Sequence, residues 1–363
     1  MRRFDSWGFQ LDRPLVISGP CSVETEEQTM ATAVGLKDYD VDILRGGIWK
    51  PRTRPNSFEG NGEKALPWLK KAGEAIGRPI AVEVATPQHV EACLKHGVDY
   101  YWIGARTSVN PFAVQEIADA LKGTNVPVMV KNPINPDLKL WLGAIERIEG
   151  AGITKIAAIH RGFSHYGESV YRNQPIWQIP IDFRLERPDM PLVCDPSHIA
   201  GRRDLLFQIA QMSLDLGFDG LMIESHVNPD EAWSDAKQQV TPDRFNEMTI
   251  ELRQRNRTTD DSSVKELRGA LEEIDRLIIE MTSERMEVVR ELGLIKKENN
   301  VAIYQPGHLA KMLERRLLKA EPSGLSKEFI NNLFDAIHTE SIRQQSEVFY
   351  DNPVSKSVGS KVS

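Results

Sequence analysis

The first 256 positions alternate short apolar runs with longer stretches in which apolar residues recur every three or four positions. Each short run has the length and β-rich composition of a buried strand, and each longer stretch has the period of an amphipathic helix. Eight such strands in one domain favour a (β/α)8 TIM barrel over an open doubly wound sheet. The absence of a glycine-rich dinucleotide fingerprint after the first strand also weakens the open-sheet alternative. The predicted strands span residues 15–19, 42–47, 80–85, 100–105, 126–131, 155–160, 191–195 and 220–225.

The pattern changes completely after residue 256. Residues 257–263 are polar and lack apolar periodicity, so they are predicted to form a linker between a barrel domain (1–256) and a helical domain (264–349). The helical domain is predicted to contain three helices, over residues 262–299, 306–320 and 325–349. Residues 1–14 are predicted to be a short polar lead with no regulatory domain, and residues 350–363 to be a disordered tail.

Composition restricts the possible partners. The chain has 363 residues and a formal net charge of −7, which argues against nucleic acid as a partner. It has no apolar run long enough to span a membrane and no signal sequence at its start, and its three cysteines are typical of a reducing compartment. We therefore expect a cytoplasmic enzyme that works without nucleic acid or membrane.

Four residues that can bind metals lie at or beyond the ends of strands one, seven and eight. In a TIM barrel the chemistry takes place at the carboxyl ends of the strands, and strands one and eight are neighbours when the barrel closes. Taken singly, each residue is better explained as a buried thiol, a turn cap or a solvated acid. Together, a sulfur, a nitrogen and two oxygen donors favour one divalent ion of the Mn, Fe, Co or Zn class. The four candidates are Cys21, His198, Glu224 and Asp235.

Basic residues follow four of the eight strands of the same predicted barrel. Because each follows an apolar strand directly, a solvated surface position is a poor explanation, and a cationic floor for phosphate and carboxylate groups is expected. These residues are Arg45, Lys50 and Arg52 after strand two, then Arg106, Lys131 and Arg161 after strands four, five and six.

At this point the sequence resembles a known family. The motifs GPCSVE, ILRGGIWKPRT, GAR, VMVKN, HRG, DPSH, MIESH and SDAKQQ occur in that order over about residues 12–256. They are similar to those of type I 3-deoxy-D-arabino-heptulosonate 7-phosphate (DAHP) synthase, of the beta subgroup. The resemblance implies condensation of phosphoenolpyruvate with erythrose 4-phosphate to DAHP and phosphate, the first step of the shikimate pathway.

The resemblance also implies roles for individual residues. The four metal candidates become the ligands of an ion that polarises the aldehyde. Arg45, Lys50, Arg106, Lys131 and Arg161 match phosphoenolpyruvate-binding positions, and Lys50, Pro51, Arg52 and Thr53 match the erythrose 4-phosphate motif. The related eight-carbon sugar acid phosphate synthase typically has Ala-Asn-Arg at 51–53, and it is set aside for that reason.

Glu83, at the end of strand three, faces the same mouth of the predicted barrel. It could position the water that adds to the intermediate. Alternatively, it could form a salt bridge to one of the floor cations. The sequence leaves both explanations open, and Glu83 joins Lys50 as a catalytic candidate.

The first helix of the helical domain carries a heptad-like apolar seam that is interrupted by Arg285. This arginine is expected either in an internal salt bridge or in a site for an anionic ligand. Lys296 lies about three turns further on the same face, whereas Arg268 lies about 100° away around the helix. Arg268 is therefore expected to serve a site in a partner chain, in a homodimer or higher oligomer formed through this helix. The seam consists of Leu267, Leu271, Ile274, Ile278, Met281, Val288, Leu292 and Ile295.

Residues 262–349 resemble the all-helical class of chorismate mutase. The resemblance implies rearrangement of chorismate to prephenate, with two carboxylates clamped and with Lys296 and Gln345 stabilising charge at the breaking ether bond. The family's substrate positions correspond here to Arg268, Arg285, Lys296, Ser341 and Gln345.

One part of the mutase motif departs from that family. Gln305, His308 and Leu309 stand where an acid, an arginine and a glutamate are usual, so a carboxylate clamp is lost unless His308 replaces it. Two hypotheses result. In the first, the chain is a bifunctional synthase and mutase; in the second, the helical domain is a catalytically weak module that binds chorismate or prephenate. Under both hypotheses, binding of prephenate or chorismate there is expected to regulate the synthase.

Overall fold

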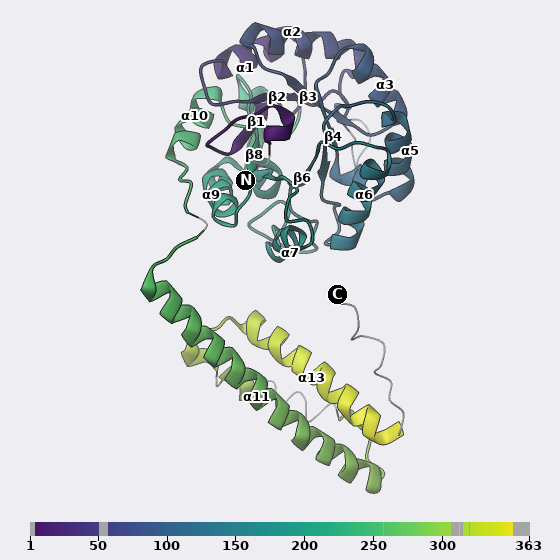
Figure 1. The fold of residues 1–363 in the computed structure, drawn as a ribbon, viewed down its shortest axis with the longest axis vertical. Coiled ribbons are helices and arrows are strands. Elements are labelled where there is room, and N and C mark those ends of the chain that lie inside the picture. The colour runs from purple at the N-terminus through teal and green to yellow at the C-terminus, as the bar shows by residue number, and fades with distance from the viewer. Residues whose placement is uncertain are drawn as a thin grey trace. The chain divides into compact units, whose positions relative to one another are not determined.

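The computed structural model describes residues 4–50, 57–256, 258–305, 312, 315–318 and 320–350. The chain divides into two compact units, residues 1–257 and 258–363. In the first unit, eight parallel strands pair in chain order and close into a barrel, which confirms the predicted fold (Figure 1). The strands are β1 (Leu15–Gly19), β2 (Ile43–Gly46), β3 (Ile80–Val84), β4 (Tyr100–Ile103), β5 (Val128–Lys131), β6 (Ile156–His160), β7 (Leu192–Cys194) and β8 (Gly220–Glu224).

The closing pair, β1 and β8, sets the geometry of the mouth. Leu15 lies opposite Gly220 and Gly19 lies opposite Glu224 in a parallel register. The loop that carries Cys21 therefore begins beside the end of the strand that carries Glu224. Residues about 200 positions apart in sequence become neighbours at the carboxyl end of the barrel.

Helices cover the outside of the barrel and bury a continuous apolar layer against the strands. Several begin at residues whose side chains accept a backbone N–H, as Thr25, Thr86, Asn110 and Asp137 do. The helices of this unit are α1 (Glu26–Leu36), α2 (Leu66–Ile76), α3 (Pro87–Lys95), α4 (Ala105–Ser108), α5 (Pro111–Leu121), α6 (Leu138–Gly150), α7 (Gln178–Glu186), α8 (Pro196–Ala200), α9 (Leu206–Asp215) and α10 (Pro242–Glu251).

The segment before β1 closes the opposite end of the barrel. Phe4 and Trp7 are each only 6% exposed, and the Trp7 ring stacks on Tyr100 with 5.7 Å between centroids. Both residues belong to the apolar cluster that fills the barrel interior. The prediction of a polar lead over residues 1–14 is therefore wrong in this respect, because its two aromatic side chains are part of the core.

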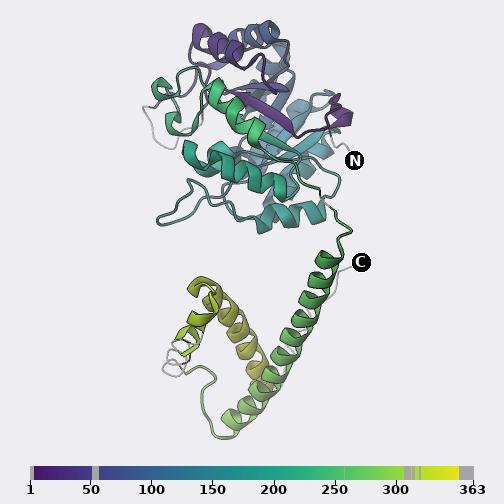
Figure 2. The same ribbon diagram turned by 90° about the vertical axis from the view of Figure 1, so that its left-hand side faces the viewer.

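The second unit contains two long helices, α11 (Ser262–Glu298) and α13 (Lys327–Tyr350), which pack side by side (Figure 2). Residues 315–318 are also helical, and the rest of the predicted middle helix lies largely outside the described residues. The contact buries Met286, Val289 and Gly293 of α11, whereas the predicted apolar seam of α11 is exposed. Of the helices in the described parts of the chain, none combines the length and apolarity of a membrane span.

Candidate functional site

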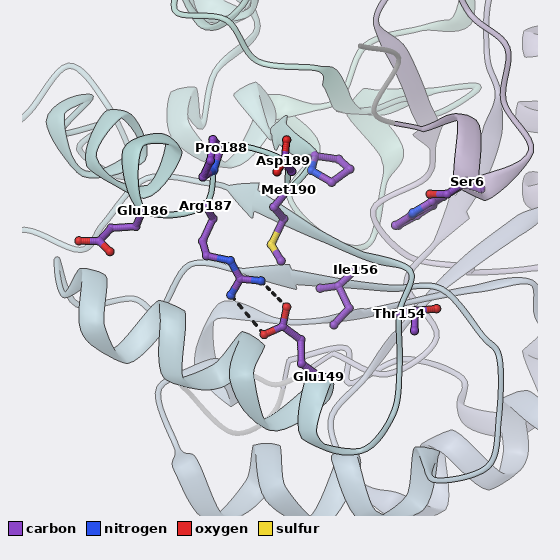
Figure 3. A pocket seen from close by; sticks show the side chains of 11 residues that line it. Ser6, Glu149, Thr154, Ile156, Glu186, Arg187, Pro188, Asp189 and Met190 are labelled. Carbon is purple, nitrogen blue, oxygen red and sulfur yellow. Dashed lines mark hydrogen bonds and ion pairs between the residues drawn. The ribbon is translucent and has the colours of Figure 1, made fainter. Parts of the chain in front are cut away.

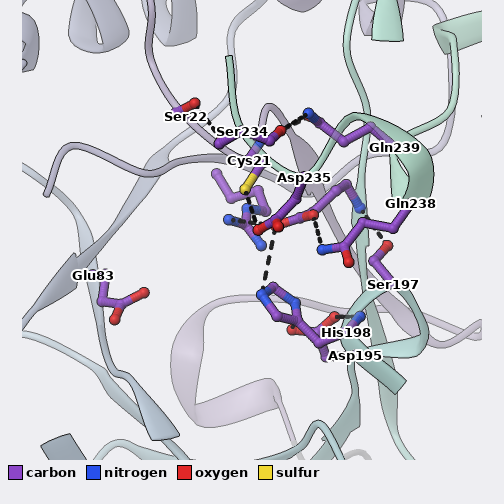
Figure 4. A network of polar contacts seen from close by, with 12 residues as sticks. Cys21, Ser22, Glu83, Asp195, Ser197, His198, Ser234, Asp235, Gln238 and Gln239 are labelled. Carbon is purple, nitrogen blue, oxygen red and sulfur yellow. Dashed lines mark hydrogen bonds and ion pairs between the residues drawn. The ribbon is translucent and has the colours of Figure 1, made fainter. Parts of the chain in front are cut away.

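The mouth of the barrel brings the four candidate metal ligands together in two pairs (Figure 4). Cys21 Sγ lies 3.4 Å from Asp235 Oδ2, and His198 Nε2 lies 3.9 Å from Glu224 Oε1. Glu224 Oε1 is buried and has no hydrogen-bond partner among the described residues. Within those residues, no group of three or more histidine, cysteine, aspartate or glutamate side chains stands close enough together to hold a metal ion.

Backbone geometry places Cys21 and Asp235. A Cβ on Gly47 would lie 2.1 Å from the Cys21 carbonyl oxygen, so only glycine allows the β2 loop to approach this closely. Asp235 adopts a left-handed conformation with φ of 49°, which aspartate tolerates better than most residues. The backbone conformation around Cys21 and at Asp235 therefore keeps both side chains at the mouth of the barrel.

Cations occupy the space around these ligands. Lys50 Nζ donates to Cys21 Sγ at 2.9 Å and to the Cys21 carbonyl at 2.7 Å. Arg172 Nη1 donates to Asp235 Oδ1 at 3.0 Å, and Arg45 Nη2 lies 3.2 Å from Glu224 Oε1. In this arrangement the Cys21 thiol and the two carboxylates each have a cation beside them.

The protonation states of the donors follow from burial and from those neighbours. Burial raises the pKa of the Cys21 thiol to about 12, so the thiol is protonated at neutral pH. Burial alone would also raise the pKa of Asp235, but Arg172 and His198 outweigh it and hold that pKa below its usual range. Burial lowers the pKa of His198, which leaves the imidazole neutral and able to act as a ligand.

Asp195 organises the site although the sequence analysis did not single it out. Its Oδ1 accepts from the His198 backbone N–H at 3.1 Å and so caps the short helix α8. Its Oδ2 accepts from Lys131 Nζ at 2.6 Å and lies 2.8 Å from His198 Nδ1. Burial would raise the pKa of this carboxyl, but His198 and Lys131 hold it well below its usual range. Its place at the end of β7, within DPSH, is the signal that could have identified it.

A pocket beside His198 contains three of the predicted basic residues. Glu83, Arg106, Lys131 and Arg161 line it together with His198. Burial lowers the pKa of Arg161 to about 10, so this guanidinium remains charged at neutral pH. Three cations on one pocket wall are suited to a small anion with more than one negative charge.

Trp102 underlies this cationic floor. The Arg45 guanidinium lies 4.9 Å and the Lys131 ammonium 5.8 Å from its ring centroid. Its indole N–H donates to Glu83 Oε2 at 3.0 Å, and a Cβ on Gly104 would lie 2.1 Å from Glu83 Oε1. Glu83 is thus held in one orientation at the pocket. Pro51, Arg52 and Thr53 of the predicted sugar phosphate motif lie outside the described residues.

A second pocket lies at the other end of the strands (Figure 3). It is lined by Trp7, by Ile156 at the start of β6 and by Met190 before β7, and Arg187 pairs with Glu149 across it. None of the predicted site residues lines it. The catalytic candidates of the barrel therefore gather at one end only.

The helical unit has its own cluster of predicted residues. Arg285 Nη1 donates to Ser341 Oγ at 2.7 Å, and Gln345, one turn after Ser341, is buried. Lys296 Nζ donates to the Ile303 carbonyl at 2.7 Å. Arg268 is exposed and lies seventeen residues before Arg285, roughly 25 Å along α11.

Of the three positions at which the sequence departs from the mutase motif, the structure describes only Gln305. Gln305 is exposed, whereas His308 and Leu309 lie outside the described residues. The internal salt bridge considered for Arg285 is not formed with any described carboxylate.

A parallel eight-stranded barrel with a cationic pocket beside cysteine, histidine and carboxylate donors defines a class of enzymes that act on small anionic substrates. Comparison with known sequences is more specific. Residues 10–260 match the DAHP synthetase I family, and residues 267–346 match chorismate mutase type II. The chain belongs to the DAHP synthetase I family, and it carries a chorismate mutase domain after the synthase domain.

Individual relatives agree with this assignment. The chain is 34% identical to a phospho-2-dehydro-3-deoxyheptonate aldolase of Thermotoga maritima, over 66% of this chain and 68% of the relative. It is 27% identical to a 2-dehydro-3-deoxyphosphooctonate aldolase of Legionella pneumophila, over 68% of this chain and 94% of the relative. A crystal structure of a Thermotoga maritima DAHP synthase superposes with a TM-score of 0.60 at 31% identity, covering 71% of this chain and 70% of that one.

Proposed function

We propose that the barrel condenses phosphoenolpyruvate with erythrose 4-phosphate to give DAHP and phosphate, and that the helical domain converts chorismate to prephenate. The observation that carries the first activity is the pocket in which Arg106, Lys131 and Arg161 adjoin His198. The second activity rests on the family match and on the cluster of Arg285, Ser341 and Gln345.

In the barrel, the chain's own residues would bind and orient the substrates. Arg45, Lys131 and Arg161 supply fixed positive charge for the phosphate and carboxylate of phosphoenolpyruvate, with Lys50 and Arg106 beside them. Because Arg45, Lys131 and Arg161 are held by buried contacts before substrate arrives, these three would stabilise developing negative charge without reorganising. Glu83, whose carboxylate accepts from the Trp102 indole N–H, would orient the water that completes the reaction.

DAHP synthases generally depend on a divalent metal, and the donors at the mouth suit one of the Mn, Fe, Co or Zn class. Cys21, His198, Glu224 and Asp235 would hold it, and Glu224 Oε1, which accepts no hydrogen bond from a described residue, would be one of the ligand atoms. Such an ion would supply Lewis acidity toward the aldehyde of erythrose 4-phosphate. Ligation by Cys21 requires the thiol to lose its proton and Lys50 to move off the sulfur.

Removing divalent metal should separate the two activities. With the intact chain in excess chelator, we expect DAHP formation to stop while chorismate consumption continues, because no mutase candidate residue is a metal ligand. Restoring Mn, Fe, Co and Zn singly, with both products measured, identifies the ions that support the synthase. If metal analysis shows that the protein is metal-free and DAHP still forms, the proposed ligand set is wrong.

A second function for the helical domain is favoured by the replacements at Gln305, His308 and Leu309. The domain could bind chorismate or prephenate and regulate the barrel while its own catalysis is weak. Saturating prephenate should then change the rate of DAHP formation by about 5-fold or more, the usual range for coupling between sites. The same titration with Arg285→Ala should show no response, and an unchanged wild-type rate at saturation would exclude this regulation.

We also propose that α11 pairs with a second copy of the chain. Its exposed apolar side chains include Leu271 (59% exposed), Ile278 (56%) and Ile295 (56%), a stripe that a soluble helix rarely leaves uncovered. Pairing through this stripe would bring Arg268 of one chain toward the Arg285 cluster of the other, since one straight helix separates them within a chain.

A further inference from the structure

Arg316, in the helical segment at residues 315–318, approaches α13 on the same side as the mutase candidates. Its guanidinium carbon lies 4.1 Å from the ring centroid of Phe334, and its Nη2 donates to Met312 Sδ at 3.1 Å. Phe334 comes two helical turns before Ser341, which accepts from Arg285. Both arginines therefore contact one face of α13, at points roughly 10 Å apart along its axis.

The two guanidinium groups influence each other. Burial lowers the pKa of Arg316, and the positive charge of Arg285 lowers it further. Burial also lowers the pKa of Arg285. Two neighbouring cations that are both partly removed from water repel each other unless an anion lies between them.

No described carboxylate compensates this charge. Two other arginines on the same helices do pair with carboxylates: Arg276 with Glu273 and Arg343 with Glu340. By contrast, the only partner that the described residues give Arg285 is a hydroxyl, and the partners they give Arg316 are a sulfur and a ring face. Each guanidinium has five N–H donors in a planar fork, so most remain available to a ligand.

A further polar atom in the cluster also lacks a partner. Gln345 is 6% exposed, and its Oε1 forms no hydrogen bond with the described residues. Burying an amide oxygen without a donor is costly, and a ligand hydroxyl would remove that cost. Two guanidinium groups that contact no described carboxylate, together with one acceptor that lacks a donor, suit a ligand with two negative groups and a hydroxyl.

We propose that Arg316 binds one carboxylate of the mutase substrate while Arg285 binds the other. The inference rests on the proposed mutase function and adds a substrate-binding residue to it. It also accounts for the departure at His308, because Arg316, eight residues further along the chain, supplies the positive charge that an arginine gives at that position in the related family. The site then takes a dicarboxylate and discriminates against monocarboxylates.

The test compares Arg316→Met with Arg315→Met in the full chain. Methionine keeps an unbranched apolar stem against Phe334 but removes the charge, and Arg315 is an exposed neighbour that contacts no site residue in the described structure. We expect Arg316→Met to raise the KM for chorismate by about 10- to 100-fold and to weaken prephenate binding in calorimetry similarly. Arg316→Lys should recover part of the loss, and Arg315→Met should match the wild type.

Circular dichroism and the rate of DAHP formation establish that each variant is folded. If Arg316→Met equals Arg315→Met in both KM and prephenate affinity, Arg316 is a packing residue and the assignment is wrong. If the wild type binds prephenate without converting chorismate, the proposed catalysis fails, and the binding comparison still decides the role of Arg316. If the wild type does neither, the proposed function and this assignment fall together.

Discussion

Cys21→Ala should abolish DAHP formation, with a loss of more than about 100-fold, while chorismate consumption stays at the wild-type rate. Removing a residue that only hydrogen-bonds to a metal ligand lowers metal affinity or activity by about 10- to 100-fold. The Cys21 thiolate would bind the metal directly, so its loss should have a larger effect. The variant also leaves the Lys50 ammonium without the sulfur that it contacts at 2.9 Å. The measurements are DAHP formation, chorismate loss, and bound metal per chain after dialysis.

Cys93→Ala is the matched control for this prediction. Cys93 is also fully buried, and burial raises the pKa of its thiol to about 12, but it lies in α3 within the apolar layer outside the barrel. This variant should retain metal and synthase activity. A Cys21→Ala enzyme that keeps both would remove Cys21 from the site.

Arg285→Ala should have the reverse effect, reducing chorismate turnover by about 100- to 1000-fold without changing DAHP formation. The side chain is a preorganised donor beside Ser341 for one carboxylate of the substrate, and losing one partner of a buried, hydrogen-bonded charge pair costs about 2 to 5 kcal/mol. Initial rates over a range of chorismate concentrations separate a loss in kcat from a rise in KM. Arg285→Lys should restore little, because an ammonium cannot form the paired contacts of a guanidinium.

Arg290→Ala provides the comparison on the same helix. Arg290 is exposed and donates to Gln344 Oε1 at 3.1 Å, so it also joins α11 to α13 but outside the cluster. Its removal should leave chorismate turnover intact. Equal losses in the two variants would mean that Arg285 acts by holding the helices together and not by contacting substrate.

The barrel was predictable because its signal is local. Each strand is a short apolar run, and the predicted range of β1, residues 15–19, coincides with the observed one. The remaining strands differ from prediction by one or two residues at their ends. Convergence of strand ends follows from barrel topology alone, so the sequence also predicted that Cys21 and Glu224 would approach each other.

Contacts between side chains that lie far apart in the sequence could not be predicted in the same way. Arg172 donates to Asp235 across 63 positions, and Lys131 donates to Asp195 across 64. The sequence separation within each pair gives no sign that the two residues touch, because the conformations of the chain beyond the strands decide which charges meet. Phe4 and Trp7 were missed for a related reason, since two aromatic residues in a polar segment have no periodicity to indicate burial.

In the helical domain the sequence correctly indicated an apolar face on α11, but it did not indicate which surface packs against that helix. The heptad-like seam of α11 is exposed, and α13 instead packs where Met286, Val289 and Gly293 lie. Gly293 permits this approach, since an added Cβ would lie 3.3 Å from Gln345. Periodicity reports that a face is apolar, but it does not specify which surface covers that face.

The aromatic closure of the barrel by Phe4 and Trp7 has an electrostatic consequence. Because that end is filled by apolar side chains, the cations above Trp102 are backed by a medium of low polarisability and face water only through the mouth. Field lines from buried charges concentrate where the dielectric constant is high. Although the protein has a net charge of −7, we therefore expect a positive potential at the mouth of the barrel, which would guide anionic substrates inward.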